Sequence, residues 1–282
     1  MTETQLTWRV HVAPSVPTEA ADKPPGTAKR AWSPISSTLI SGERDAVLVD
    51  PPLTVEQNDQ LVTWLQDSGK NLTAVYLTHG HGDHWFGLGT VLDQFPGARG
   101  LATPTVLKRM REQVSTPALR EFWRSRFPHE LPSNIVLPEE LEGSSILLEG
   151  HELNVIELGH TDTDDTTCLH VPSIDLVVAG DSVYNDVHLY LTESSAEGRA
   201  AWLRALDRIE SLAPRAVVSG HKRAGNDDDP RDIEQTRQYI RDFDELERRY
   251  ATTRELFDAI LERHRDRINS GALWGSCRAA KG

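Results

Sequence analysis

The chain has 282 residues, a formal net charge of −13 at pH 7, and 38% hydrophobic against 26% charged residues. This composition is that of an ordinary globular protein, and the length is sufficient for a sizeable core. The negative charge argues against a nucleic-acid partner, because the phosphates would be repelled.

The sequence also bounds where the protein works. It contains only two cysteines, fewer than a disulfide-stabilised secreted protein normally carries. The first ten residues lack the basic and apolar segments of a signal peptide, and no apolar window approaches the length of a membrane span. We therefore expect a cytoplasmic protein that acts on a small molecule without a membrane partner. The sequence leaves open whether the protein forms a homodimer.

The first third of the chain alternates strand and helix patterns. Residues 6–12 alternate apolar and polar side chains, which is typical of a half-buried strand. The five prolines of residues 13–34 predict a long surface loop. The segments that follow are predicted as strands at 37–40, 46–49, 74–77 and 101–103, and as helices at 54–67 and 88–95.

Residues 105–132 differ from the flanking sequence, because their apolar residues repeat at helical spacing on both sides of Pro117. We expect a helical hairpin inserted between elements of the sheet. Two interpretations stay open. The insertion either packs as ordinary core or forms a lid or substrate wall, since insertions on rigid scaffolds often determine specificity.

The second half of the chain continues the alternation. Ser194 and Glu197 are spaced as a capping box for a helix over 195–212, and the last fifth of the chain is helical by periodicity. Strands are predicted at 135–137, 145–148, 153–158, 167–171, 176–179 and 216–218. We expect one domain, residues 1–230, which includes the insertion at about 105–132, and a C-terminal helical extension, residues 231–282, packed on it.

One segment concentrates side chains that bind metals. Directly after the strand at 74–77, imidazoles and a carboxylate follow one another in the sequence His79-Gly80-His81-Gly82-Asp83-His84. Glycine allows tight backbone turns, and imidazole and carboxylate are ligands of zinc and its first-row neighbours. Three further predicted strands end at a glycine followed by such a residue, namely His160, Asp181 and His221. Strands that end at one edge of a sheet would bring these side chains together.

The segment resembles the His-x-His-x-Asp-His signature of the metallo-β-lactamase superfamily, and the resemblance covers roughly residues 36–222. It implies an α/β fold, the four-layer αβ/βα sandwich, with a dinuclear site at its upper edge. The ligand sets that it implies are His79, His81 and His160 for one metal, Asp83, His84 and His221 for the second, and Asp181 as the bridge.

By this resemblance the protein is a dinuclear zinc-dependent hydrolase, although the same ligands would accept iron, manganese or cobalt. Two such ions, roughly 3.5–4 Å apart, would share a hydroxide nucleophile at neutral pH and polarise the substrate carbonyl. The β-lactamases of the superfamily generally lack an aspartate at the position of Asp181. An antibiotic-hydrolysing role is therefore not expected.

Two residues are expected to take part in the reaction. Asp83 would contact the second metal and hold the proton of the leaving group, with a purely ligating role left open. Tyr184 stands at the offset from Asp181 at which lactone hydrolases of this fold carry a tyrosine that donates to the substrate carbonyl. The other interpretation is a tyrosine that packs under the edge of the sheet.

Opening of a lactone is the preferred reaction, because the Tyr184 offset and the aromatic insertion suit an apolar ring or acyl substrate. A thioester hydrolase of the glyoxalase II type is the nearest alternative, although no clear match to glutathione-binding basic residues is found. A phosphodiesterase or RNA-processing nuclease is a further alternative, against which the net charge argues. A non-catalytic protein is not expected, since every position of the ligand pattern is filled.

Overall fold

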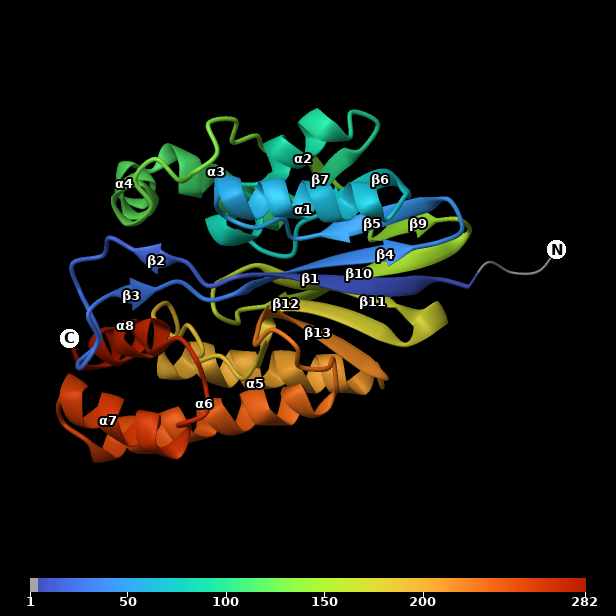
Figure 1. Ribbon diagram of the computed structural model, residues 1–282. Coiled ribbons are helices and arrows are strands. Elements are labelled where there is room, and N and C mark those ends of the chain that lie inside the picture. The colour runs from blue at the N-terminus through green and yellow to red at the C-terminus, as the bar shows by residue number, and fades with distance from the viewer. Residues whose placement is uncertain (1–4) are drawn as a thin grey trace.

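The computed structural model describes residues 5–282 (Figure 1). Residues 1–4, which belong to the segment used for the expectation about a signal peptide, lie outside the described residues. Two β-sheets pack face to face, and helices cover the outer face of each sheet. This is the predicted four-layer αβ/βα sandwich, and its layers bring the ends of several strands to one edge.

The first sheet is built from the first half of the chain. Its strands are β1 (Thr7–Ala13), β4 (Ile35–Ser41), β5 (Asp45–Val49), β6 (Asn71–Tyr76), β7 (Arg99–Ala102) and β8 (Glu139–Glu140). They lie in the order β1-β4-β5-β6-β7-β8, antiparallel as far as β5 and parallel from there on. The strand predicted at 135–137 is wrong, because Ile135 and Val136 pack on the core as irregular chain and Pro138 intervenes before β8.

The second sheet comes from the second half. Its strands are β9 (Ser145–Leu148), β10 (His151–Gly159), β11 (Thr166–Val171), β12 (Leu176–Asn185) and β13 (Ala216–Lys222). They lie in the order β13-β12-β11-β10-β9. The pair β12–β13 is parallel, so both of these strands end at the same edge. Apolar side chains of both sheets, such as Tyr76 and Leu169, form the core between them.

Helices close both outer faces. The helices on the first sheet are α1 (Val55–Asp67) and α2 (Leu88–Gln94), and those on the second sheet are α5 (Ala196–Ser211) and α6 (Arg231–Arg249). Thr54 and Gln57 form a capping box at the start of α1. At α5 the predicted cap is displaced by one residue, because the side chain of Ser195, and not that of Ser194, accepts a hydrogen bond from the backbone of Gly198.

Three further units lie at one end of the sandwich, on the left in Figure 1. They are the helices α3 (Pro104–Ser115) and α4 (Pro117–Arg126), the ribbon β2 (Pro17–Thr18) and β3 (Arg30–Ala31), and the helices α7 (Thr253–Arg263) and α8 (Ser270–Lys281). The two helices predicted around Pro117 are thus present. No helix within residues 5–282 is long and apolar enough to cross a membrane.

Candidate metal centre

The histidine-rich segment is held in place at the end of β6. The carboxylate of Asp50 accepts hydrogen bonds from the backbone N–H of Thr78 at 2.9 Å and from its hydroxyl at 2.6 Å. A short 3₁₀ helix, Gly82–His84, then turns the chain back on itself. The side chains of this segment are buried, so their polar atoms need partners within the protein or in a bound ligand.

A first group of possible ligand atoms comes from three separate segments. One atom from each of His79, His81, Asp162 and Asp181 lies within 4.8 Å of all the others. Asp162 Oδ2 lies 2.8 Å from His81 Nδ1 and 3.8 Å from His79 Nε2. All four residues are buried.

A second group consists of Asp83, His84 and His221, again with ligand atoms within 4.8 Å of one another. Asp181 reaches this group as well, since its Oδ1 lies 3.2 Å from His84 Nε2 and its Oδ2 lies 3.1 Å from His221 Nε2. Asp181 therefore stands between the two groups, where a bridging carboxylate is required. A carboxylate in this position contacts both halves of the centre.

Three of the ring nitrogens that face away from the centre have hydrogen-bond partners, whereas His84 Nδ1, which lies 3.5 Å from Asp50 Oδ2, forms no hydrogen bond within the described residues. The three pairs are His79 Nδ1 with Thr78 Oγ1 (3.0 Å), His81 Nε2 with Glu193 Oε1 (3.1 Å) and His221 Nδ1 with the carbonyl of Pro34 (2.7 Å). Such partners fix the orientation and tautomer of metal-binding histidines. Glu193 in this role was missed by the sequence analysis, because it lies in an irregular segment that no motif marks.

Several buried atoms at the centre lack a hydrogen bond of normal geometry. Within the described residues these include His79 Nε2, His84 Nδ1, Asp162 Oδ2 and Asp181 Oδ1, of which the two carboxylate oxygens lie within ion-pair distance of His81 Nδ1 (2.8 Å) and His84 Nε2 (3.2 Å). Buried polar atoms of this kind are rare in folded proteins and need an explanation. Imidazole nitrogens and carboxylate oxygens that converge at this spacing fit divalent first-row metal ions. We conclude that the residues present fit divalent metal ions, with one ligand different from the set that the resemblance implies.

His160 is the predicted ligand that the structure does not bring to the centre. Its Nδ1 lies 2.7 Å from Asp164 and its Nε2 lies 2.9 Å from the hydroxyl of Ser194, so both ring nitrogens are engaged elsewhere. Arg109 binds the carboxylates of Asp164 and Asp165 and ties this turn to α3. A break in the β10–β11 register between Glu157 and Gly159 precedes the turn. His160 is consequently directed away from the centre, and the first group of possible ligand atoms contains Asp162 and not His160.

The remaining predicted ligands, His79, His81, Asp83, His84, Asp181 and His221, are brought together. Their metal-binding role stays a prediction. Asp162 was missed, although the sequence contains a signal for it. It is an acidic residue two positions after His160, in the same turn between two strands.

Close backbone approach at the end of β13 is a condition for this geometry. A Cβ atom on Gly220 would lie 2.1 Å from Asp181 Oδ1, well inside contact distance. Only glycine therefore fits beside Asp181. This is the physical reason for the glycine before His221.

The imidazoles of the centre favour the ionised form of two carboxylates, those of Asp181 and Asp83. Burial alone would raise the pKa of Asp181, but His221 and His84 outweigh burial and hold the pKa well below its ordinary value. For Asp83 burial again acts upward, and the same two imidazoles leave the pKa below its usual range. Asp181 and Asp83 are thus suited to bind a cation in their ionised form.

Two side chains orient the carboxylates. The Tyr184 hydroxyl donates a hydrogen bond to Asp181 Oδ2 at 2.9 Å, and the Tyr184 ring packs on Trp202 and His221. The indole N–H of Trp32 donates to Asp83 Oδ2 at 2.7 Å. Trp32 was missed from the sequence, because it lies in the segment predicted as a surface loop. Tyr184 combines packing with a polar contact, but this contact is to Asp181.

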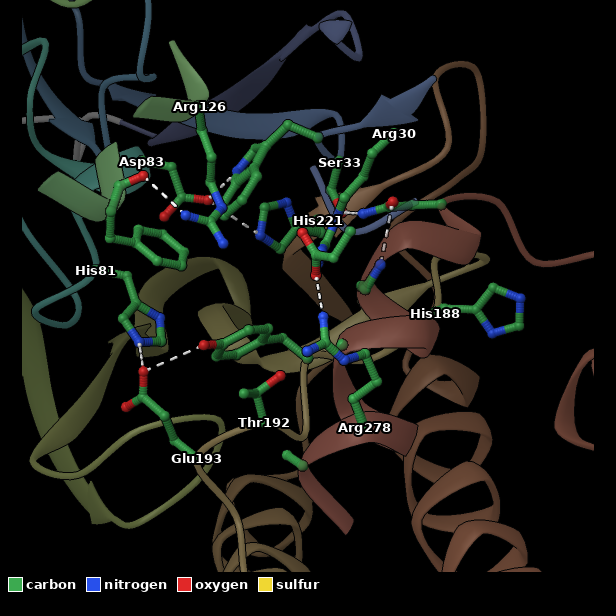
Figure 2. A pocket seen from close by; sticks show the side chains of 18 of the residues that line it. Arg30, Ser33, His81, Asp83, Arg126, His188, Thr192, Glu193, His221 and Arg278 are labelled. Carbon is green, nitrogen blue, oxygen red and sulfur yellow. Dashed lines mark hydrogen bonds and ion pairs between the residues drawn. The ribbon is translucent and has the colours of Figure 1, made fainter. Parts of the chain in front are cut away.

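The centre opens into a cavity of about 540 Å³. Figure 2 shows side chains of the cavity wall, with His81, Asp83 and His221 from the centre and Glu193 in contact with His81. The cavity is also lined by aromatic side chains, namely Trp32, Phe122, Trp123, Tyr184 and Tyr190. A site of this size, with an apolar wall and a few converging polar groups, is typical of small-molecule binding.

Comparisons with known proteins agree with this geometry. The profile of the Metallo-beta-lactamase superfamily matches residues 30–221. A metallo-beta-lactamase type 2 from Bacteroides fragilis is 23% identical over 215 residues, which cover 74% of this chain and 76% of the relative.

Solved structures share the fold. A metallo-beta-lactamase family protein from Thermus thermophilus superposes with a TM-score of 0.64 at 21% identity, over 95% of this chain and 93% of that protein. A metallo-beta-lactamase from Pontibacter korlensis gives a TM-score of 0.58 at 17% identity, over 83% and 99%. Since the superfamily profile also spans more than half of the sequence, the chain belongs to the metallo-β-lactamase superfamily of metal-dependent hydrolases.

Proposed function

We propose that the protein hydrolyses a small ester-like bond with two bound divalent cations, and that a lactone is its preferred substrate. The observation that carries the proposal is the convergence of buried imidazole nitrogens and carboxylate oxygens, within 4.8 Å of one another in each group, beside the cavity that His81, Asp83, Asp181 and His221 line. In the proposed assignment the first metal is held by His79, His81 and Asp162. The other assigned ligands are Asp83, His84 and His221 for the second metal and Asp181 between the two.

Metal ions bound there would polarise the substrate carbonyl and lower the pKa of a water molecule toward neutrality. The protein itself supplies orientation. Tyr184 and Trp32 each occupy one carboxylate oxygen, of Asp181 and Asp83 respectively, and so fix the direction of the other oxygen. Within the described chain Asp83 Oδ1 accepts no hydrogen bond, and we assign it the proton of the leaving group.

The aromatic wall has a separate task. Trp32 packs edge-on against Phe122 and Trp123, with ring centroids 6.2 and 5.3 Å apart, and all three rings line the cavity. Such a wall binds the apolar part of a ring or acyl chain and excludes water from the reacting end. This favours the second interpretation of the insertion, a substrate wall contributed by α4.

Zinc is the proposed metal, because imidazoles still dominate the assigned ligands. The exchange of His160 for Asp162 adds a carboxylate, and carboxylates suit manganese better than imidazoles do. Metal analysis of the purified protein is therefore needed to tell zinc from manganese.

A thioester is the second candidate bond. One observation favours it beyond the sequence argument. The cavity is lined by Arg30, Arg126 and Arg278, which suit a thioester whose thiol part carries carboxylates. The same observation is compatible with a lactone that carries an acid group.

The test is a comparison of initial rates on three substrates, namely an alkyl-substituted γ-lactone, a glutathione thioester and a cephalosporin. Each rate is measured with metal-loaded protein, with chelated protein, and with chelated protein after zinc or manganese is restored. We expect chelator-sensitive opening of the lactone that exceeds the other two rates. Faster thioester cleavage would favour the second candidate. Protein that contains two metal ions but hydrolyses none of these bonds would contradict the proposal.

A further inference from the structure

The cavity wall has a second group of polar side chains besides the metal centre, which we call the arginine end. Three arginines line it, and they come from distant parts of the chain, Arg30 from β3, Arg126 from the end of α4 and Arg278 from α8 (Figure 2). The backbone of the long N-terminal segment is joined to α4 here, because the N–H of Glu19 donates to the carbonyl of Arg126 at 3.0 Å. Arg126 is therefore held at a fixed point of the cavity wall.

Two of these arginines share one carboxylate. Asp22 Oδ2 lies 2.5 Å from Arg30 Nη1 and 3.2 Å from Arg278 Nη1. Arg30 is buried, whereas Arg278 is exposed at the mouth. Asp22 compensates one positive charge, so this pair alone leaves an excess of positive charge.

Arg126 has no carboxylate partner within the described residues. Its Nη1 donates to the carbonyl of Phe122 at 3.0 Å, and its guanidinium lies over the Phe122 ring at 3.7 Å from the ring centroid. Among the described residues, the Nε atom of Arg126 is buried without a hydrogen-bond partner, and its Nη2 atom has no protein acceptor. Burial and the neighbouring Arg30 lower the pKa of Arg126, as expected for a cation close to another cation.

Another arginine shows that missing ion pairs do not by themselves indicate a ligand. Arg267 also lacks a carboxylate partner within residues 5–282, but its Nη1 and Nη2 donate to the carbonyls of Val187 and Gln235. Its role is structural, and it does not line the cavity. Arg126 differs in both respects, since it lines the cavity and keeps donors free.

We propose that Arg126 binds a carboxylate of the substrate, so that the substrate is an amphipathic organic acid whose ester-like bond lies at the metal centre. This inference rests on the proposed hydrolase function of the same cavity. The guanidinium presents planar donors that match a carboxylate in a bidentate contact. A chain of contacts connects Arg126 to Asp83: the guanidinium lies over Phe122, Phe122 packs on Trp32, and Trp32 donates to Asp83. The two aromatic rings would cover the apolar part of such a substrate.

The inference is tested by equilibrium binding, which does not depend on turnover. The probes are 4-phenylbutyrate and its neutral amide, titrated by calorimetry into the full-length, metal-loaded protein. The variants are Arg126→Gln and, as a matched control, Arg124→Gln, an exposed arginine on the same helix that does not line this cavity. Metal content and thermal midpoint are measured for each protein.

In the wild-type protein the acid should bind roughly 10- to 100-fold more tightly than the amide, the range of a charge-assisted hydrogen-bonded contact. Arg126→Gln should remove most of this preference, and Arg124→Gln should keep it. Equal binding of acid and amide by the wild-type protein would overturn the inference even if the variant did not fold. A preference kept in Arg126→Gln would also overturn it, because the acid would then be held by the metals. Binding as expected without hydrolysis of any ester would count against the proposed function alone.

Discussion

The two ends of the cavity are built in different ways. At the metal end, the side chains lie within strands β12 and β13, in the segment after β6 or in the turn between β10 and β11, and the backbone is fixed by the sheet hydrogen bonds and by contacts such as Asp50 with Thr78. At the arginine end, the lining comes from a ribbon, an inserted helix and the last helix of the chain. Most of the metal end follows from local sequence, whereas the arginine end depends on tertiary packing.

This difference separates chemistry from recognition. Strand ends are rigid and place ligand atoms within small tolerances, as metal binding requires. Inserted and terminal elements vary more easily without disturbing the sheets, and they supply the wall that contacts the rest of the substrate. Changes at the metal end should therefore reduce metal binding and turnover together, and changes at the far end should act mainly on substrate choice.

The strongest test of the metal end is Asp181→Asn. The amide keeps the shape but removes the negative charge that contacts both groups of ligands. We expect lower metal content and a loss of turnover of at least about 100-fold, more than is typical for residues that only support ligands. Asp175→Asn, a partly exposed aspartate before β12 that pairs with Arg215 outside the centre, is the control. Unchanged metal content and rate would exclude the bridging role.

Tyr184→Phe tests whether Tyr184 affects the reaction through its hydrogen bond to Asp181. The substitution removes the hydrogen bond to Asp181 and keeps the ring packing. We expect a rate loss of roughly 10- to 100-fold and weaker metal retention in a chelator competition. Tyr250→Phe, a half-buried tyrosine on the C-terminal side of α6, serves as the control. A lower rate with unaltered metal retention would instead favour direct contact of Tyr184 with the substrate.

Trp32→Phe tests the junction of the two ends, because the same side chain lines the aromatic wall and donates to Asp83. Loss of the indole N–H should lower kcat by about 10-fold, and loss of ring area should raise KM for an apolar substrate. Trp64→Phe, an indole on α1, is the control. A change in KM alone would mean that the hydrogen bond to Asp83 contributes nothing.

The smallest effect is expected at His188, which lines the far part of the cavity and packs on Tyr239. Burial lowers the pKa of His188 to about 3. Below the ordinary histidine pKa the unfolded chain takes up a proton that the folded protein does not, so stability falls as the pH falls. Relative to His188→Asn, the wild-type free energy of unfolding should lose about 1.4 kcal/mol per pH unit between roughly pH 6 and 4.

Urea unfolding at several pH values measures this difference, with the exposed His129→Asn as control. Parallel curves for wild type and His188→Asn would mean that the far wall opens readily to water. That result would mean that the cavity wall around His188 is not tightly packed.

The sequence predicts the two ends unequally. The fold, the helices of the insertion and the cluster around His79 follow from patterns that are local in the chain, such as apolar periodicity and ligand spacing. Trp32 and Arg126 carry no local pattern, because their roles depend on packing between the N-terminal segment and α4. The exchange of His160 for Asp162 depends on the break in register at the end of β10 and on the hold of Arg109 on Asp164. No spacing rule contains these contacts.

The most direct test of the account is metal analysis of Asp162→Asn beside His160→Asn. Both variants replace a candidate ligand of the same turn with the same residue, so that only the position differs. We expect Asp162→Asn to lose one of the two proposed metal ions after dialysis against a weak chelator, whereas His160→Asn should keep both. Loss of metal in His160→Asn together with full retention in Asp162→Asn would contradict the assignment and restore His160 as the ligand.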